Sequence, residues 1–189
     1  LTRHFNTNSL KGFGVDDFPK GIIAAGAAIH YLHETQHDKI SYISSLSRID
    51  QGQFVWLDKF TIRNLELLHS ANANAKTLID IIDKTTSPMG SRLMRRWLSL
   101  PLKNKDQITA RYEIVDFFVN NNEYISSFQD AIRQVGDLER LISKVSLLRV
   151  NPRELLQVAR ALDQIEIIKQ LCAESNNEAL KLYSEQLNV

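Results

Sequence analysis

Residues 77–102, TLIDIIDKTTSPMGSRLMRRWLSLPL, decide the fold. Ser87 stands directly before Pro88, and this pair is typical of an N-cap residue followed by a proline in the first helical turn. Pro101 then stops the helix. The stretch therefore predicts one helix between residues 87 and 102, preceded by a short, strongly apolar helix over residues 76–85.

The chain after Asp58 predicts further helices on both sides of this stretch. A capping-box pattern at Asn104 and Gln107 begins one of them. Its expected buried stripe is Ile108, Tyr112, Val115 and Val119. The expected helical segments are 60–70, 104–122, 122–135, 137–148 and a run of about 20 residues after Asn151-Pro152, with 177–189 either continuing that run or turning back.

The first part of the chain differs from this helical part. Gly12 and Gly14 indicate a loop, and Pro19 begins a helix that we expect to reach about His37. Residues 39–50 and 51–58 are rich in β-branched side chains and predict a small β-hairpin. The fold class expected is mainly α with this small β-hairpin, and the chain divides near residues 38–58.

The composition excludes several classes of protein. The chain has 189 residues, a formal net charge of +1, 43% hydrophobic residues and 24% charged residues, which is a normal globular balance. One cysteine, Cys172, excludes a disulfide framework. The sequence shows no membrane span and no signal peptide. Because the chain opens with Leu1, we expect a piece of a longer protein.

Two short motifs resemble those of enzymes, but the residues around each motif do not fit the enzyme site. His33-Glu34-Thr35-Gln36-His37 has the H-E-x-x-H spacing of a zinc hydrolase, but His37 falls at the expected helix end. The nearest carboxylates for a third ligand, Asp58 and Glu66, are not marked as ligands by any pattern. Gly12-Phe13-Gly14 lacks the third glycine of a dinucleotide loop, and no phosphate-binding P-loop occurs. We therefore expect no catalytic residue, cofactor or metal in this chain.

Three arginines share one face of the 87–102 helix. Arg92, Arg95 and Arg96 are spaced i, i+3 and i+4, so they can contact DNA phosphates. The same side chains can instead pair with nearby carboxylates, or pack their stems beside Trp97. The spacing alone leaves these alternatives open.

Two long motifs together resemble the MutS family of DNA mismatch-repair proteins. The first is LDKFTIRNLEL at residues 57–67, and the second is the stretch at 77–102. DLERL at 137–141 and NPREL at 151–155 agree with the same family. Its junction motif maps onto Asp58, Thr61, Asn64, Glu66, Gly90, Arg92, Trp97 and Pro101. In these positions we expect Asp58 and Thr61 to cap a helix, and Gly90 to allow close packing.

The resemblance implies a division of labour. Residues 1–50 would be the end of the connector domain, and 51–189 the first part of the helical core (domain III), running into the lever helix. The parent protein would bind mismatched DNA as a homodimer, use ATP and Mg²⁺ in an ATPase domain outside this chain, and meet a MutL-type partner in the bacterial cytoplasm. This piece would be a structural and allosteric link, not an enzyme. The first alternative is an autonomous helical nucleic-acid-binding module, supported by the arginine face and the basic stretch 133–160. The second is the zinc hydrolase.

Overall fold

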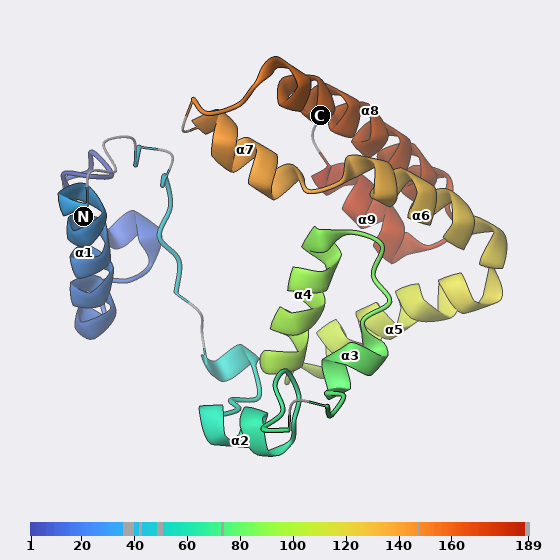
Figure 1. Ribbon diagram of the computed structural model, residues 1–189, viewed down its shortest axis with the longest axis horizontal. Coiled ribbons are helices and arrows are strands. Elements are labelled where there is room, and N and C mark those ends of the chain that lie inside the picture. Colours follow the sequence, from blue (N-terminus) through green and yellow to red (C-terminus); the bar gives the residue numbers. More distant parts are fainter. Residues whose placement is uncertain (36–39, 42, 49–50, 73, 147, 188–189) are drawn as a thin grey trace. The chain divides into compact units, whose positions relative to one another are not determined.

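A computed structural model describes residues 1–189 except for 36–39, 42, 49–50, 73, 147 and 188–189 (Figure 1). The chain divides into two compact units, Leu1–Asp50 and Gln51–Val189. The described part is mainly helical, which confirms that element of the expected fold class.

The described residues of the first unit contain one α-helix, α1, at Pro19–Glu34. Pro19 occupies the first turn, as predicted, because the amide that proline lacks would have no helical partner there. The helix ends before the expected His37, which lies outside the described residues. A short 3₁₀ helix, η1 (Lys11–Phe13), precedes it and closes on Gly14 at φ 64°, a conformation that favours glycine.

The start of α1 is fixed by Phe18. Its ring lies so close to Gly21 that a Cβ there would be 2.1 Å from a ring carbon, so no larger residue fits without displacing the ring. The guanidinium of Arg48 lies 4.9 Å from the centre of the same ring and pairs with Asp17 at 3.0 Å. Arg48 therefore joins the end of this unit to the beginning of its helix.

The predicted β-hairpin is wrong for the described residues, which contain no strand. Residues 51–53 form a 3₁₀ helix, η2 (Gln51–Gln53), and Phe54 makes an isolated antiparallel bridge to Leu102. The N–H of Val55 donates to Pro101 O at 2.7 Å, and the N–H of Lys103 donates to Gln53 O at 3.0 Å. Residues 53–55 thus pair with residues 101–103, at the end of the second motif, and not with the preceding β-branched segment. We call this pairing the 53–103 strap.

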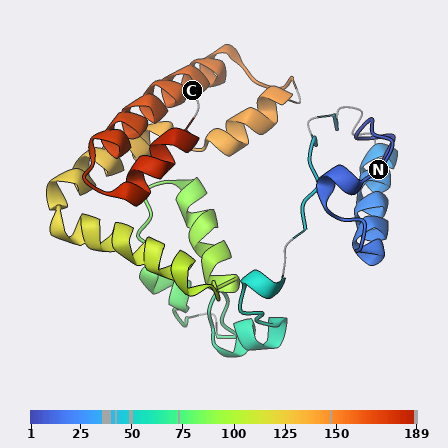
Figure 2. The same ribbon diagram turned by 180° about the vertical axis from the view of Figure 1, so that it is seen from behind.

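The second unit is built from eight described α-helices (Figures 1 and 2). They are α2 (Lys59–Asn64), α3 (Leu78–Ile82), α4 (Pro88–Ser99), α5 (Lys105–Asn120), α6 (Asn122–Val135), α7 (Leu138–Ser146), α8 (Pro152–Glu174) and α9 (Glu178–Gln186). Ser87 and Asn104 cap α4 and α5 through their side chains, as predicted. The expected long helix is α8, with 23 residues, and Asn151 and Glu154 form a capping box at its start.

Helices α6, α8 and α9 pack side by side, and α5 joins them at one end. Phe128, Cys172 and Leu180 form the buried centre of this bundle, one from each of α6, α8 and α9. From α5, Ile114, Phe117 and Phe118 pack against it. The rings of Phe118 and Phe128 meet edge-on at 5.1 Å.

The buried stripe predicted for α5 is wrong within this chain. Tyr112, Val115 and Val119 are 69%, 58% and 65% exposed. The face of α5 that enters the bundle carries Phe117 and Phe118 instead. Helical spacing located an apolar face correctly, but α5 has a second one with larger aromatic side chains, and the bundle covers that one.

None of the helices that the model describes is long and apolar enough to cross a membrane.

We predict that Phe128→Ala destabilises the chain by about 3–5 kcal/mol, because it removes a ring from the centre of the bundle. Chemical denaturation followed by circular dichroism measures this loss. Tyr112→Ala removes a ring of similar size from an exposed position of α5 and serves as the control. Equal losses for the two variants would contradict the placement of the core.

Candidate functional site

The residues of the predicted junction motif lie between Asp58 and Pro101, in α2, in α4 and in the turns beside these two helices. Asp58 caps α2, and its carboxylate accepts a hydrogen bond from the Thr61 N–H at 2.6 Å. This bond lowers the pKa of Asp58. Asp58 and Thr61 thus act together to begin α2.

Glu66 connects α2 to α3 through its backbone. Its φ is 48°, so the chain turns sharply after α2. Its carbonyl then accepts the Leu78 N–H at 3.0 Å, while its carboxylate accepts the Ser70 hydroxyl at 2.7 Å. Asn64 is the exposed last residue of α2, and its side chain forms no hydrogen bond with another described residue.

Asp83 ties α3 to the start of α4, a role that the sequence did not suggest. It accepts hydrogen bonds from the hydroxyls of Ser91, at 2.5 Å, and of Thr85, at 2.6 Å. These bonds, the Ser91 bond first, lower the pKa of Asp83. Gly90 lies in the first turn of α4. A Cβ on it would be 3.1 Å from the Thr85 Cβ and 3.2 Å from the Ser87 Oγ. The close approach at Gly90 is therefore to the preceding turn, not to another helix.

Arg92 links the junction directly to the start of α7. Its Nη1 and Nη2 donate to the two carboxylate oxygens of Asp137 at 3.0 and 2.7 Å. Its Nε and Nη2 donate to Glu139 Oε2 at 2.9 and 2.5 Å. Asp137 and Glu139 stand at the start of α7, directly after Gly136. One guanidinium thus joins α4 to α7 with the bidentate geometry that only arginine provides.

The three arginines of α4 have different neighbours. Arg95 lies near enough to Asp80 and Asp83 for its charge to help lower the pKa of both carboxyls. Arg96 is exposed and lines a groove beside α4. Of the three, Arg92 therefore has carboxylate partners, as one of the sequence alternatives proposed.

Trp97 is 42% exposed and has a cationic neighbour from another helix. The guanidinium of Arg111, on α5, lies 3.6 Å from the centre of the indole. This contact joins α4 to α5, just as Arg92 joins α4 to α7. Pro101 follows, and its carbonyl belongs to the 53–103 strap.

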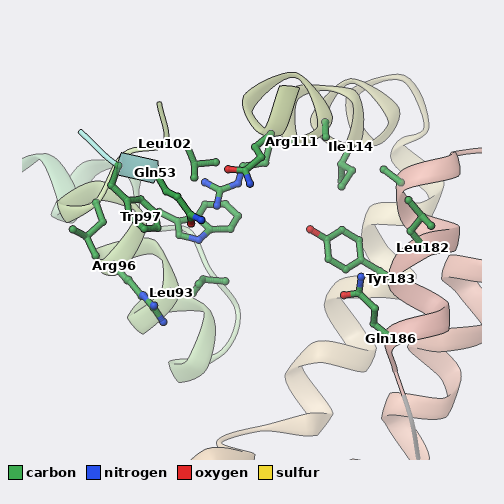
Figure 3. A pocket seen from close by; sticks show the side chains of 15 residues that line it. Gln53, Leu93, Arg96, Trp97, Leu102, Arg111, Ile114, Leu182, Tyr183 and Gln186 are labelled. Atoms are coloured by element: carbon green, nitrogen blue, oxygen red, sulfur yellow. The ribbon is translucent and has the colours of Figure 1, made fainter. Parts of the chain in front are cut away.

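A groove of about 540 Å³ opens between α4, α5 and α9 (Figure 3). Trp97 and Arg111 lie on one side of it, and Leu182 and Tyr183 on the other. Arginine and glutamine side chains line it together with these apolar groups, so its surface is mixed. Titratable side chains paired for acid–base chemistry do not line it.

The described residues do not bring the candidate zinc ligands together. Of its motif, Gln36 and His37 lie outside the described residues, while Glu34 pairs with His30 at 3.3 Å. Asp58 and Glu66, the suggested third ligands, are used by Thr61 and Ser70. Across the described residues, no three histidine, cysteine or acidic side chains gather as a metal site would require. Cys172 is buried, and burial raises the pKa of its thiol.

Comparison with protein families identifies the family to which the chain belongs. The model of MutS domain III matches residues 60–188, and that of MutS domain II matches residues 1–44. The chain belongs to the MutS family. The segment that carries the junction, Asp58 to Pro101, lies almost wholly within the match to MutS domain III.

Relatives in several bacteria are named DNA mismatch repair protein MutS. The chain is 52% identical to that of Christiangramia forsetii, 53% to that of Flavobacterium psychrophilum and 47% to that of Bacteroides thetaiotaomicron. Each match covers the whole of this chain and 22% of the relative. The chain therefore spans about a fifth of the length of these MutS proteins.

Three partners of the junction were missed at the sequence level. They are Asp137 and Glu139, which lie 45 and 47 residues from Arg92, and Arg111, which lies on the helix that follows α4. A signal existed for the first two, since two acids at the start of one helix complement an arginine on another. Sequence offers no signal for the stacking of Arg111 on Trp97.

We predict that Arg92→Gln lowers the stability of the chain at about pH 7 and that the difference disappears on acidification to about pH 2. Arg92 holds the pKa of Asp137 below its usual range. The contact between Arg92 and ionised Asp137 therefore stabilises the fold at pH values above the unfolded-state pKa of Asp137. This stabilisation is lost as the pH falls through the lower, folded-state pKa of Asp137. Urea titrations at several pH values measure it.

Arg96→Gln is the matched control, because it makes the same change on the same helix without removing a described ion pair. A deficit in Arg92→Gln that persists unchanged at low pH would rule out the carboxylates as its cause.

Proposed function

We propose that this chain is the link between the connector and the helical core in a longer MutS mismatch-repair protein. Residues 1–50 form the end of the connector domain, and residues 51–189 form the first part of the core. α8 leads into the lever. The role of the chain is structural and allosteric: it transmits displacement between the DNA-binding parts and the ATPase of the parent.

The observation that carries this proposal is the Arg92 contact with Asp137 and Glu139. It couples the junction helices α2–α4 to α7, and α7 packs on α8. α8 has 23 residues and is about 34 Å long at 1.5 Å per residue. A packed helix of this length moves as a rigid body, so a shift at α4 reaches the far end of the bundle.

The parent protein supplies the chemistry in this proposal. It binds mismatched DNA as a homodimer, binds ATP and Mg²⁺ in a separate domain, and engages a MutL-type partner in the bacterial cytoplasm. None of the described residues of this chain has a catalytic role. Contact of Arg92, Arg95 and Arg96 with DNA phosphates remains part of the alternative, in which the chain is an autonomous nucleic-acid-binding module.

The first test is a fluorescence-anisotropy titration of the chain against matched and mismatched duplexes at about 50 and 200 mM salt. We expect weak binding or none, without preference for the mismatch, because Arg92 is paired with carboxylates. Tight binding with a steep salt dependence would favour the autonomous module. Tight binding that prefers the mismatch would overturn the assigned division of labour.

The second test uses Arg92→Gln in the full-length parent, where coupling can be measured. We expect mismatch affinity without nucleotide to stay near that of the wild type, while the effect of ATP on this affinity falls by roughly fivefold or more. Arg96→Gln should leave both quantities unchanged. Unaltered coupling in a folded Arg92→Gln variant would contradict the relay role.

A further inference from the structure

Helix α7 lies between the junction and α8 and has little buried apolar surface of its own. None of its residues with a described exposure is fully buried, in contrast to residues of α6 and α8. Leu138, Leu141 and Val145 are half-buried, and Ile142 is 48% exposed. Because this apolar packing is incomplete, the position of α7 depends on the polar contacts at its two ends. Arg92 supplies the contact at the first end.

Lys144, in the last turn of α7, supplies the contact at the second end. Its ammonium donates to Oε1 of Glu154, in the first turn of α8. Its backbone carbonyl accepts the N–H of Arg149 at 2.9 Å. The side chains of Lys144 and Glu154 are 35% and 18% exposed, so this ion pair is partly shielded from water and salt. The pair therefore holds the two helix ends together more firmly than an ion pair in open solvent would.

The carboxylate of Glu154 also begins α8. Its Oε2 accepts the Asn151 N–H at 3.1 Å, while Asn151 Oδ1 accepts the Glu154 N–H at 2.9 Å. The bond from Lys144 and then the bond from Asn151 lower the pKa of Glu154. Asn151 and Glu154 belong to the NPREL motif at 151–155. One carboxylate thus serves both the cap of α8 and the contact with α7, so a displacement of Lys144 acts directly on the first turn of α8.

The turn between the two helices does not provide a comparable connection. Leu148 and Arg149 are exposed there, and Leu148 adopts φ 54°, in the left-handed region. Exposed side chains pack against few neighbours, so covalent continuity leaves the angle between α7 and α8 weakly defined. The contact from Lys144 to Glu154 bridges this turn and spans ten residues of sequence.

We propose that Lys144 and Glu154 are positioning residues that pass a displacement of α7 to the start of α8. The inference rests on the proposed function, because it names the second contact of the same relay. Arg92 fixes the first end of α7 to α4, and Lys144 fixes the last turn of α7 to α8. α7 has nine residues and is about 14 Å long, so it is a short rod with an ionic contact at each end.

The test is the effect of ATP on mismatch affinity in the full-length parent, measured for Lys144→Met and, separately, for Glu154→Gln. Lys144→Met removes the ammonium and keeps most of the apolar stem. Glu154→Gln removes the charge and keeps an oxygen that can accept the Asn151 N–H in the cap of α8. We expect each variant to lower the effect of ATP by roughly fivefold or more, while mismatch affinity without nucleotide stays near that of the wild type.

Lys181→Met is the matched control. It removes the ion pair of Lys181 with Glu178, at 2.9 Å, which lies within α9 and joins no two helices. This variant should leave the effect of ATP unchanged. Lys144→Arg keeps a cation opposite Glu154 and should keep the effect of ATP within about twofold of the wild type. Circular dichroism checks that each variant is folded.

An unchanged effect of ATP in folded Lys144→Met would overturn the inference. So would a fall in mismatch affinity that is equally large with and without ATP, because it would make Lys144 a DNA contact. A Lys144→Met variant that does not fold would also overturn it, since the pair would then be a requirement of the fold and not of the relay.

Failure of this inference is distinguishable from failure of the proposed function, because Arg92→Gln is measured in the same experiment. If Arg92→Gln lowers the effect of ATP and Lys144→Met does not, the relay stands and the contact between α7 and α8 alone is overturned. If both variants respond to ATP as the wild type does, the relay role itself fails.

Discussion

The guanidinium of Arg92 is the contact through which α4 reaches the start of α7 in the second unit. It meets two carboxylates at once: Asp137 directly precedes α7, after the glycine turn, and Glu139 lies in the first turn of α7. Gly136 adopts φ 66° there, so the turn that presents Asp137 to Arg92 requires a residue without a side chain. Without this contact, the junction helices would be joined to the bundle mainly through the stacking of Arg111 on Trp97 and through α5.

The helices of the bundle carry more apolar side chains than they bury against each other. Each of α6, α8 and α9 contributes one residue to the buried centre, namely Phe128, Cys172 and Leu180. Leu155 and Leu162 on α8 are 54% and 40% exposed, as the outer stripe of α5 is. The helices therefore carry more apolar surface than their mutual contacts cover. The chain spans 22% of the length of its relatives. Apolar helix surface stays exposed in such a segment when the parts of the protein that would cover it belong to the remaining sequence.

Local signals in the sequence predicted local structure well. The predicted caps at Ser87 and Asn104 place the starts of α4 and α5, because a cap needs only residues three positions apart. The hairpin failed because β-branched content does not identify the partner of a segment, which proved to be the turn at 101–103. Arg92 was found through its spacing, whereas its partners 45 and 47 residues away depend on tertiary packing. Spacing identified the apolar stripe on α5, but it cannot tell which of the two apolar faces of that helix is buried by the other helices of the chain.

The 53–103 strap has a consequence for how this core is delimited. The match to MutS domain III begins at residue 60, yet the backbone of residues 53–55 is bonded to the turn between α4 and α5. The strap therefore closes the intervening chain, with α2, α3 and α4, into a loop whose ends are held together. The hydrogen bonds of the strap offset part of the entropy that closing this loop costs on folding. An autonomous core that begins at residue 60 would lose this closure, whereas one that begins at Gln51 would retain it.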